Sequence, residues 1–139
     1  MPVLNHPDGS PISQVNPLPV ASSASDLGVH GVGAAATAVT ITLPAAGAGL
    51  FHYIDAIEIV LFSTAARTGS ATPVSVTSAN LRGYGLTFAS AGLIGSVDRY
   101  NLSSDRPMKS AVANTVSTIS LPAVTGALWR YNVIYSAGA

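Results

Sequence analysis

The sequence of 139 residues has no cysteine, few charged side chains and a balance of positive and negative charge. Without cysteine, neither a disulfide framework nor a thiolate metal site can form. Charged residues make up 9% of the chain, against about 25% in ordinary soluble domains. The six basic and six acidic side chains cancel, so the basic surface with which proteins bind nucleic acid is missing. We therefore expect no nucleic acid as a partner.

Long apolar runs are also missing. The longest, Ile54–Phe62, is interrupted by Asp55 and Glu58 and is far shorter than the ~20 residues of a membrane-spanning helix. No membrane partner is therefore expected. The first residues lack the basic and apolar regions of a secretory signal, so no signal peptide is expected. A surface with so few charges is explained if neighbouring subunits cover much of it, which predicts a homo-oligomer.

Residues 1–35 differ from the rest because they hold five of the nine prolines. Each proline removes a backbone donor and favours extended geometry in the residue before it. We interpret this segment as an extended arm or linker, which is either a frayed terminus or an arm lying over a neighbouring subunit. In the second case its apolar side chains would make the subunit or capsid contacts: Leu4, Ile12, Val15, Leu18 and Val20.

Residues 36–139 show β patterns throughout, and no window of eleven residues keeps helical spacing. Strands are expected at 37–43, 50–63, 74–77, 87–89, 108–112, 116–121 and 128–136, with an edge strand or loop at 96–102. About eight short strands at roughly ten-residue spacing are typical of an antiparallel sandwich. The predicted fold is all-β: a single antiparallel, jelly-roll-like β-sandwich that follows an extended N-terminal arm.

One unit occurs twice in this domain. Residues 40–53 align with residues 118–131 without a gap and share seven identities. Each copy contains a β-branched run, a proline, a loop of small residues and an aromatic run, which predicts a strand, a loop and a second strand. We expect the two units to lie as neighbours in the core.

The strand expected at 50–63 contains a conflict. If Phe51, Tyr53 and Ile57 face the core together with Ile59 and Leu61, then Asp55 faces it too. Either Asp55 is paired at a subunit contact, or a β-bulge near residues 54–56 changes the phase. Because Asp55 and Glu58 interrupt an otherwise apolar strand, both are candidate subunit or capsid contacts.

No catalytic, cofactor or metal site is predicted. The histidines His6, His30 and His52 lie far apart in the sequence, and no serine lies in a nucleophile motif. We therefore expect no enzyme. The aromatic residues are explained either as core or as a platform for sugars, and their alternation with polar residues favours the core. These residues are Phe51, Tyr53, Trp129, Tyr131 and Tyr135.

Several segments together carry a resemblance: Thr40–Ala45, Leu50–Ile54, Asn114-Thr115, Ser120–Ala123 and Leu128–Tyr131. With these motifs the chain resembles small head decoration (cement) proteins and related structural proteins of tailed bacteriophages. The resemblance implies a compact β domain, often trimeric, that binds the major capsid protein and stabilises the capsid lattice. It implies a location on the virion surface after synthesis in the host cytoplasm, and no catalytic residue. The alternative is a carbohydrate-binding or receptor-binding β-sandwich module of a phage tail or fibre.

Overall fold

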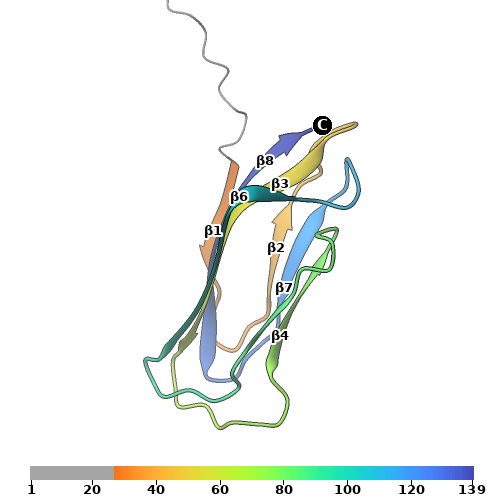
Figure 1. Ribbon diagram of the computed structural model, residues 1–139. Helices are drawn as coiled ribbons and strands as arrows, with labels where there is room; N and C mark the ends of the chain where they lie inside the picture. Colours follow the sequence, from red (N-terminus) through yellow and green to blue (C-terminus); the bar gives the residue numbers. More distant parts are fainter. Residues whose placement is uncertain (1–26) are drawn as a thin grey trace, which may run out of the picture.

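The computed structural model describes residues 27–139 as two four-stranded antiparallel sheets that pack face to face (Figure 1). The strands are β1 (Leu27–Val32), β2 (Val39–Leu43), β3 (Phe51–Ser63), β4 (Val74–Ala79), β5 (Leu86–Phe88), β6 (Val97–Lys109), β7 (Ser117–Leu121) and β8 (Ala127–Gly138). One sheet has the order β1-β8-β3-β6 and the other β2-β7-β4-β5. This is the strand order of an eight-stranded jelly roll. The predicted all-β sandwich is confirmed.

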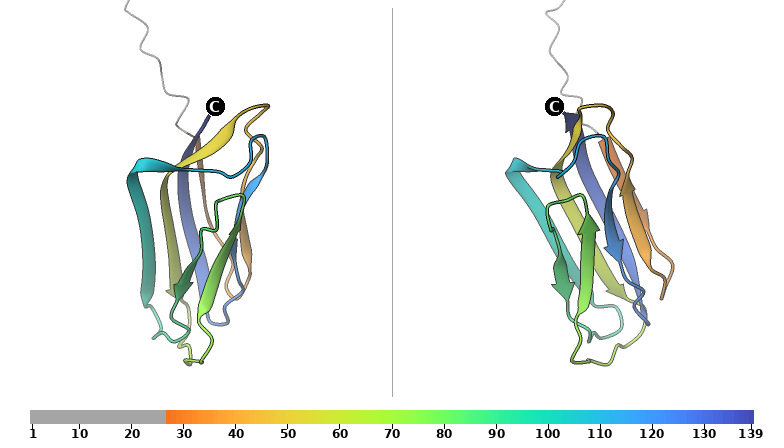
Figure 2. Two further views of the ribbon diagram at one scale, coloured as in Figure 1. Left: turned by 45° about the vertical axis from the view of Figure 1, so that its right-hand side comes forward. Right: turned by 90° about the vertical axis from the view of Figure 1, so that its right-hand side faces the viewer.

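The two similar units are neighbours, as predicted. Their first strands pair with each other in one sheet, with Ile41 opposite Ile119. Their second strands pair in the other sheet, where β3 and β8 share the longest ladder of the fold. In the right-hand view of Figure 2 the β2-β7-β4-β5 sheet lies in front of the other sheet. The two units therefore supply both central strands of one sheet, β3 and β8, and the adjacent strands β2 and β7 of the other, where β2 is at the edge.

The first strand lies in the segment expected to be an arm, so the sandwich begins at Leu27 and not at residue 36. β1 pairs with β8 over its whole length. Its two glycines weaken the strand pattern, which explains why the sequence predicted a linker here. Packing explains the glycine at position 31, because a Cβ atom there would lie 2.6 Å from the hydroxyl oxygen of Tyr131. The aromatic ring thus occupies the space that a side chain would need.

The conflict in β3 is resolved by a β-bulge. The register of β3 shifts between Ile54 and Ala56 against both β6 and β8. Before the bulge, His52 and Ile54 are buried, and after it Ile57, Ile59 and Leu61 are buried. Phe51 and Tyr53 therefore lie on the outer side, and the expectation that they face the core is wrong. The extra residue changes the phase because side chains alternate with a period of two.

The last difference concerns β6. The sequence predicted an edge strand or loop at 96–102 and a separate strand at 108–112, whereas one strand of 13 residues runs from Val97 to Lys109. Its second half pairs again with β3, with Met108 opposite Ile54. Pro107 is compatible with this strand because β6 is at the edge of its sheet, where a missing backbone donor leaves no ladder bond unmade.

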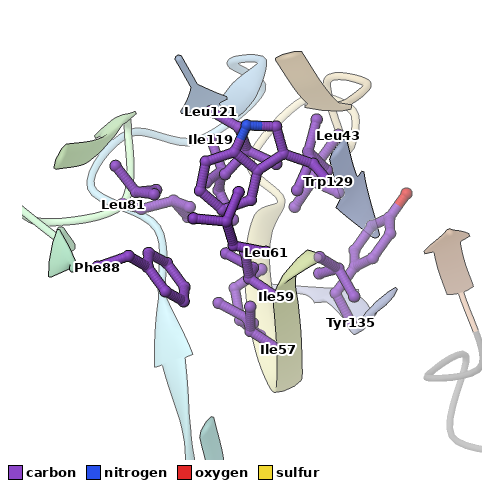
Figure 3. Packing of buried hydrophobic residues seen from close by; sticks show 14 of the residues in the cluster. Leu43, Ile57, Ile59, Leu61, Leu81, Phe88, Ile119, Leu121, Trp129 and Tyr135 are labelled. Carbon is purple, nitrogen blue, oxygen red and sulfur yellow. The ribbon is translucent and has the colours of Figure 1, made fainter. Parts of the chain in front are cut away.

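The core lies between the sheets and is centred on Trp129, which is 1% exposed (Figure 3). The rings of Phe88 and Trp129 meet edge to face with centroids 5.3 Å apart, a favourable aromatic geometry. Tyr135 is also buried, and Tyr131 packs against the cluster from a half-buried position. The prediction of core aromatics is thus confirmed for the residues of β8, while Phe51 and Tyr53 lie outside.

Candidate interaction surface

A cleft lies on the outer face of the β1-β8-β3-β6 sheet. Register places Val32, Arg130, Val60 and Arg99 side by side across the four strands. The neighbouring row contains the apolar residues Leu128, Phe62 and Val97. These side chains surround a cleft of about 420 Å³, which Glu58 also lines. The cleft is therefore lined by apolar side chains together with one acidic and two basic side chains.

The charges at the cleft are incompletely paired. The carboxylate of Glu58 lies 3.9 Å from Nε of Arg99, and both side chains are substantially exposed. An exposed pair at this distance stabilises the fold by about 0–1 kcal/mol. The guanidinium of Arg130 is exposed and has no ion pair or side-chain hydrogen bond with residues 27–139. Arg130 is thus available to a carboxylate from outside the described part of the chain.

A second apolar feature is the turn between β5 and β6. Its side chains Leu93 and Ile94 are 78% and 72% exposed, the largest values among the exposed large hydrophobic residues of the described chain. The turn is nevertheless well fastened: the backbone N–H of Ser96 donates to Leu93, and that of Gly95 donates to Ser63. Gly95 has φ of +78°, which favours glycine. The turn presents two aliphatic side chains on a fixed backbone.

Arg67 holds this turn from inside. Its Nε donates to Oγ of Ser63 at 2.9 Å, and its Nη1 donates to the carbonyl oxygens of Ala89 and Ser90. Its Nη2 lies 3.2 Å from the carboxylate of Asp98, and the Arg67 side chain is 2% exposed. Two backbone hydrogen bonds also link Arg67 and Gly92. Because these bonds use most of its donors, we assign the guanidinium a structural role.

The same packing requires glycine at position 92. A Cβ atom on Gly92 would lie 2.5 Å from Nη2 of Arg67 and 2.8 Å from Oγ of Ser63. The sequence analysis singles out none of Arg67, Leu93 and Ile94. An aliphatic pair flanked by glycines in a turn is the signal that could have found them, since turns are usually polar.

His52 makes a buried contact with the side chain of Ser117. Nδ1 of His52 lies 2.7 Å from Oγ of Ser117, and Nε2 lies 2.7 Å from the carbonyl oxygen of Pro44. Both residues are buried, and Asn80 donates a further hydrogen bond to Ser117. A nucleophilic serine must reach its substrate, and this hydroxyl is enclosed between the sheets. In residues 27–139 no group of three or more His, Asp or Glu side chains could hold a metal ion.

A wider hollow of about 650 Å³ lies among loops next to Arg67. Its lining includes hydroxyl side chains such as Thr68, Ser70 and Thr125 and the apolar residues Pro73 and Val124. No aromatic side chain is among the residues that line it. The hollow therefore offers hydrogen bonds and apolar contact, without a ring on which a sugar could stack.

The predicted contact residues fall in three places. Glu58 lies at the rim of the cleft beside Arg99. Asp55 is in the bulge of β3, between the inward-facing Ile54 and Ile57, so it lies on the outer side of the sheet. Within the described chain Asp55 has no ion pair. The five residues predicted for the arm, Leu4, Ile12, Val15, Leu18 and Val20, lie outside the described residues.

Comparison of the chain with protein-family models, with curated proteins and with solved structures finds no match. Within residues 27–139 there is no helix that is long and apolar enough to span a membrane. The geometry of the outer face and of the Leu93–Ile94 turn therefore carries the functional argument.

Proposed function

We propose that the chain is a structural protein of a tailed-phage virion, a decoration (cement) protein that binds the capsid lattice and associates with itself. The observation that carries the proposal is the Leu93–Ile94 turn, which keeps two aliphatic side chains in water on a backbone fixed by Arg67. A prominent apolar pair on a rigid turn suits a contact with another protein, because little conformational entropy is lost on binding.

The β domain then docks on the shell through this turn, and the N-terminal arm adds a second contact. Apolar burial supplies the binding energy, which agrees with the low charge of the chain. The jelly roll is also found in viral capsid proteins, lectins and cupins, so the fold supports the proposal without selecting it. The resemblance to decoration proteins is the second support.

The proposal is tested by cosedimentation of the purified protein with phage shells from which it has been removed. Substitution of Leu93 and Ile94 by serine should weaken shell binding at least about tenfold, since two buried aliphatic side chains contribute several kcal/mol. Val112→Ser is the matched control. This exposed aliphatic residue lies in the loop after β6, at the other end of the sandwich (Figure 1).

The arm is tested separately. Removal of residues 1–26 leaves β1 intact, whereas a deletion that reaches residue 30 would also remove part of a sheet strand. The shortened chain should fold and bind shells more weakly than the full chain. Undiminished binding would show that the arm makes no contact.

Carbohydrate or receptor binding by a tail or fibre module is the second candidate. The hollow beside Arg67 favours it, because several hydroxyl side chains converge there. The burial of Trp129 counts against an aromatic platform on β8. A glycan array with the intact protein tests this candidate, and Ser70→Val, a substitution in the lining, should abolish any signal that comes from the hollow.

A further inference from the structure

The outer face of the β1-β8-β3-β6 sheet carries both signs of charge between apolar residues. Along β3 this face presents Ala56, Glu58, Val60 and Phe62 in succession. Opposite them on β8 lie Ile134, Asn132, Arg130 and Leu128. The two strands thus present a row of paired residue types: small with apolar, acid with amide, apolar with cation, and apolar with apolar.

This arrangement makes the face complementary to itself. A two-fold axis that runs along the strands between β3 and β8 places β8 of one copy over β3 of the other. Each residue of β8 then lies over the same β3 residue, in the second copy, that it pairs with in its own sheet. Leu128 lies over Phe62 of the second copy, and Asn132 lies over Glu58 of the second copy. Arg130 lies one row along from Glu58 of the second copy, within reach of a long side chain. No like charges oppose each other between the two central strands.

We propose that two copies of this chain pack back to back through this face, with Glu58 of one copy paired to Arg130 of the other. The inference rests on the proposed function, whose self-association it assigns to a surface. Face-to-face sheets that pack with nearly aligned strands are an established arrangement. The axis also points the Leu93–Ile94 turns of both copies in one direction, as docking on a common shell requires.

The size of the face fits this role. Four strands about 4.8 Å apart and about nine residues long cover roughly 500 Å² in projection. Standard interfaces bury about 800 Å² of accessible surface per partner, and side-chain relief raises accessible area above projected area. In the dimer, Arg130, which has no ion pair within its own chain, pairs with a carboxylate, and the half-exposed side chain of Ile134 is removed from water. A two-fold contact gives dimers, whereas the resemblance to decoration proteins implies trimers, so the mass of the assembly distinguishes the two.

The first experiment compares two aliphatic residues of equal exposure. Ile134 on the outer face and Val116 before β7 are both 44% exposed. Sedimentation equilibrium of the full chain should give twice the chain mass of 14.0 kDa at tens of micromolar. Ile134→Asp should raise the dissociation constant at least about tenfold, because it buries a charge where the proposed contact has an aliphatic side chain. Val116→Asp should leave it unchanged.

The second experiment exchanges the charges. Glu58→Arg and Arg130→Glu should each weaken the dimer about tenfold, and the double variant should return to within about threefold of the natural chain. Arg82→Gln, which removes an exposed charge in the loop after β4, outside this face, should leave association unchanged. A double variant no tighter than the single variants, a monomer, or a trimer indifferent to these substitutions would overturn the inference. None of these outcomes touches shell binding by the Leu93–Ile94 turn, which tests the proposed function separately.

Discussion

The indole Nε1 of Trp129 donates a 2.7 Å hydrogen bond to the carbonyl oxygen of Pro122. The other similar unit has an equivalent contact, in which Nε2 of His52 lies 2.7 Å from the carbonyl oxygen of Pro44. In both units a buried ring near the start of the second strand contacts the carbonyl oxygen of the proline that follows the first strand. A carbonyl oxygen only accepts, so Nε2 of His52 carries the hydrogen in this contact. The two units thus share this fastening of strand to loop, although the rings come from non-equivalent positions, because Trp129 aligns with Phe51 and not with His52.

Because Trp129 makes this hydrogen bond and fills the core, we expect a large loss of stability for Trp129→Phe. The smaller ring leaves a cavity between the sheets and leaves the carbonyl oxygen of Pro122 without its donor. Together these effects should lower the free energy of unfolding by about 2–4 kcal/mol. Urea unfolding followed by circular dichroism measures the change. Phe51→Leu on the outer side should cost less than about 1.5 kcal/mol, and equal losses for both variants would contradict the assignment.

Arg67→Met should destabilise the fold by about 2–4 kcal/mol. The substitution leaves the carbonyl oxygens of Ala89 and Ser90 unpaired and removes the partner of Asp98. It should also speed amide hydrogen exchange at Gly92 and Gly95, because the turn loses its support. Arg99→Gln is the control, since Arg99 is exposed and its pair is long. Exchange rates at the two glycines that match those of the natural chain would show that the turn is held without Arg67.

The raised pKa of Tyr84 leads us to expect a loss of stability at alkaline pH. Burial, followed by the neighbouring Tyr100, raises the pKa of Tyr84 well above its ordinary value. Above about pH 10 the tyrosine of the unfolded chain releases its proton while the folded chain retains it, so the free energy of unfolding falls as pH rises. Tyr84→Phe should make this fall less steep between about pH 9 and 11. Thermal unfolding across that range measures the slope, and equal slopes for both proteins would refute the prediction.

The same substitution has a second expected effect at neutral pH. The hydroxyl of Tyr84 is the one buried side-chain polar atom of the described residues without a hydrogen-bond partner. Removing it should leave stability unchanged or raise it by up to about 1 kcal/mol. A loss above about 1 kcal/mol would indicate that the hydroxyl has a partner in solution.

Trp129 also discriminates between the candidate functions. Because it is buried, acrylamide should quench its fluorescence weakly in the folded protein and strongly in urea. Sugars should leave its emission unchanged, since no ring face is open to stack on. A saturable change of emission on addition of a sugar would favour the carbohydrate-binding alternative.

Much of the fold could be predicted because the strand patterns are strong where both faces are constrained. The alternation around Trp129 and Val133 located β8, and the run of β-branched residues located β3. The bulge was one of two explanations for Asp55, and only the paired strands decide between them. β1 was not predicted because its two glycines weaken the strand pattern, while the residues that explain the strand, Tyr131 beside Gly31 and the paired strand β8, are far away in the sequence.

The interaction surface was predictable only in part. Glu58 stood out as a charge in an apolar strand, and it does line the cleft. The cleft itself combines residues from β1, β3, β6 and β8, whose proximity follows from the strand order. The turn that carries Leu93 and Ile94 is held by Arg67. This contact joins residues 25 positions or more apart in the sequence, and local patterns cannot reveal it.

The central claim is that this chain is a structural component of a virion. The claim implies that a phage genome encodes the chain, and quantitative mass spectrometry of purified particles of such a phage tests it most directly. The account predicts the chain in the particle in a fixed ratio to the major capsid protein, and its loss from particles when Leu93 and Ile94 are replaced by serine. Particles that lack the chain altogether, while it accumulates in the infected cell, would contradict the claim.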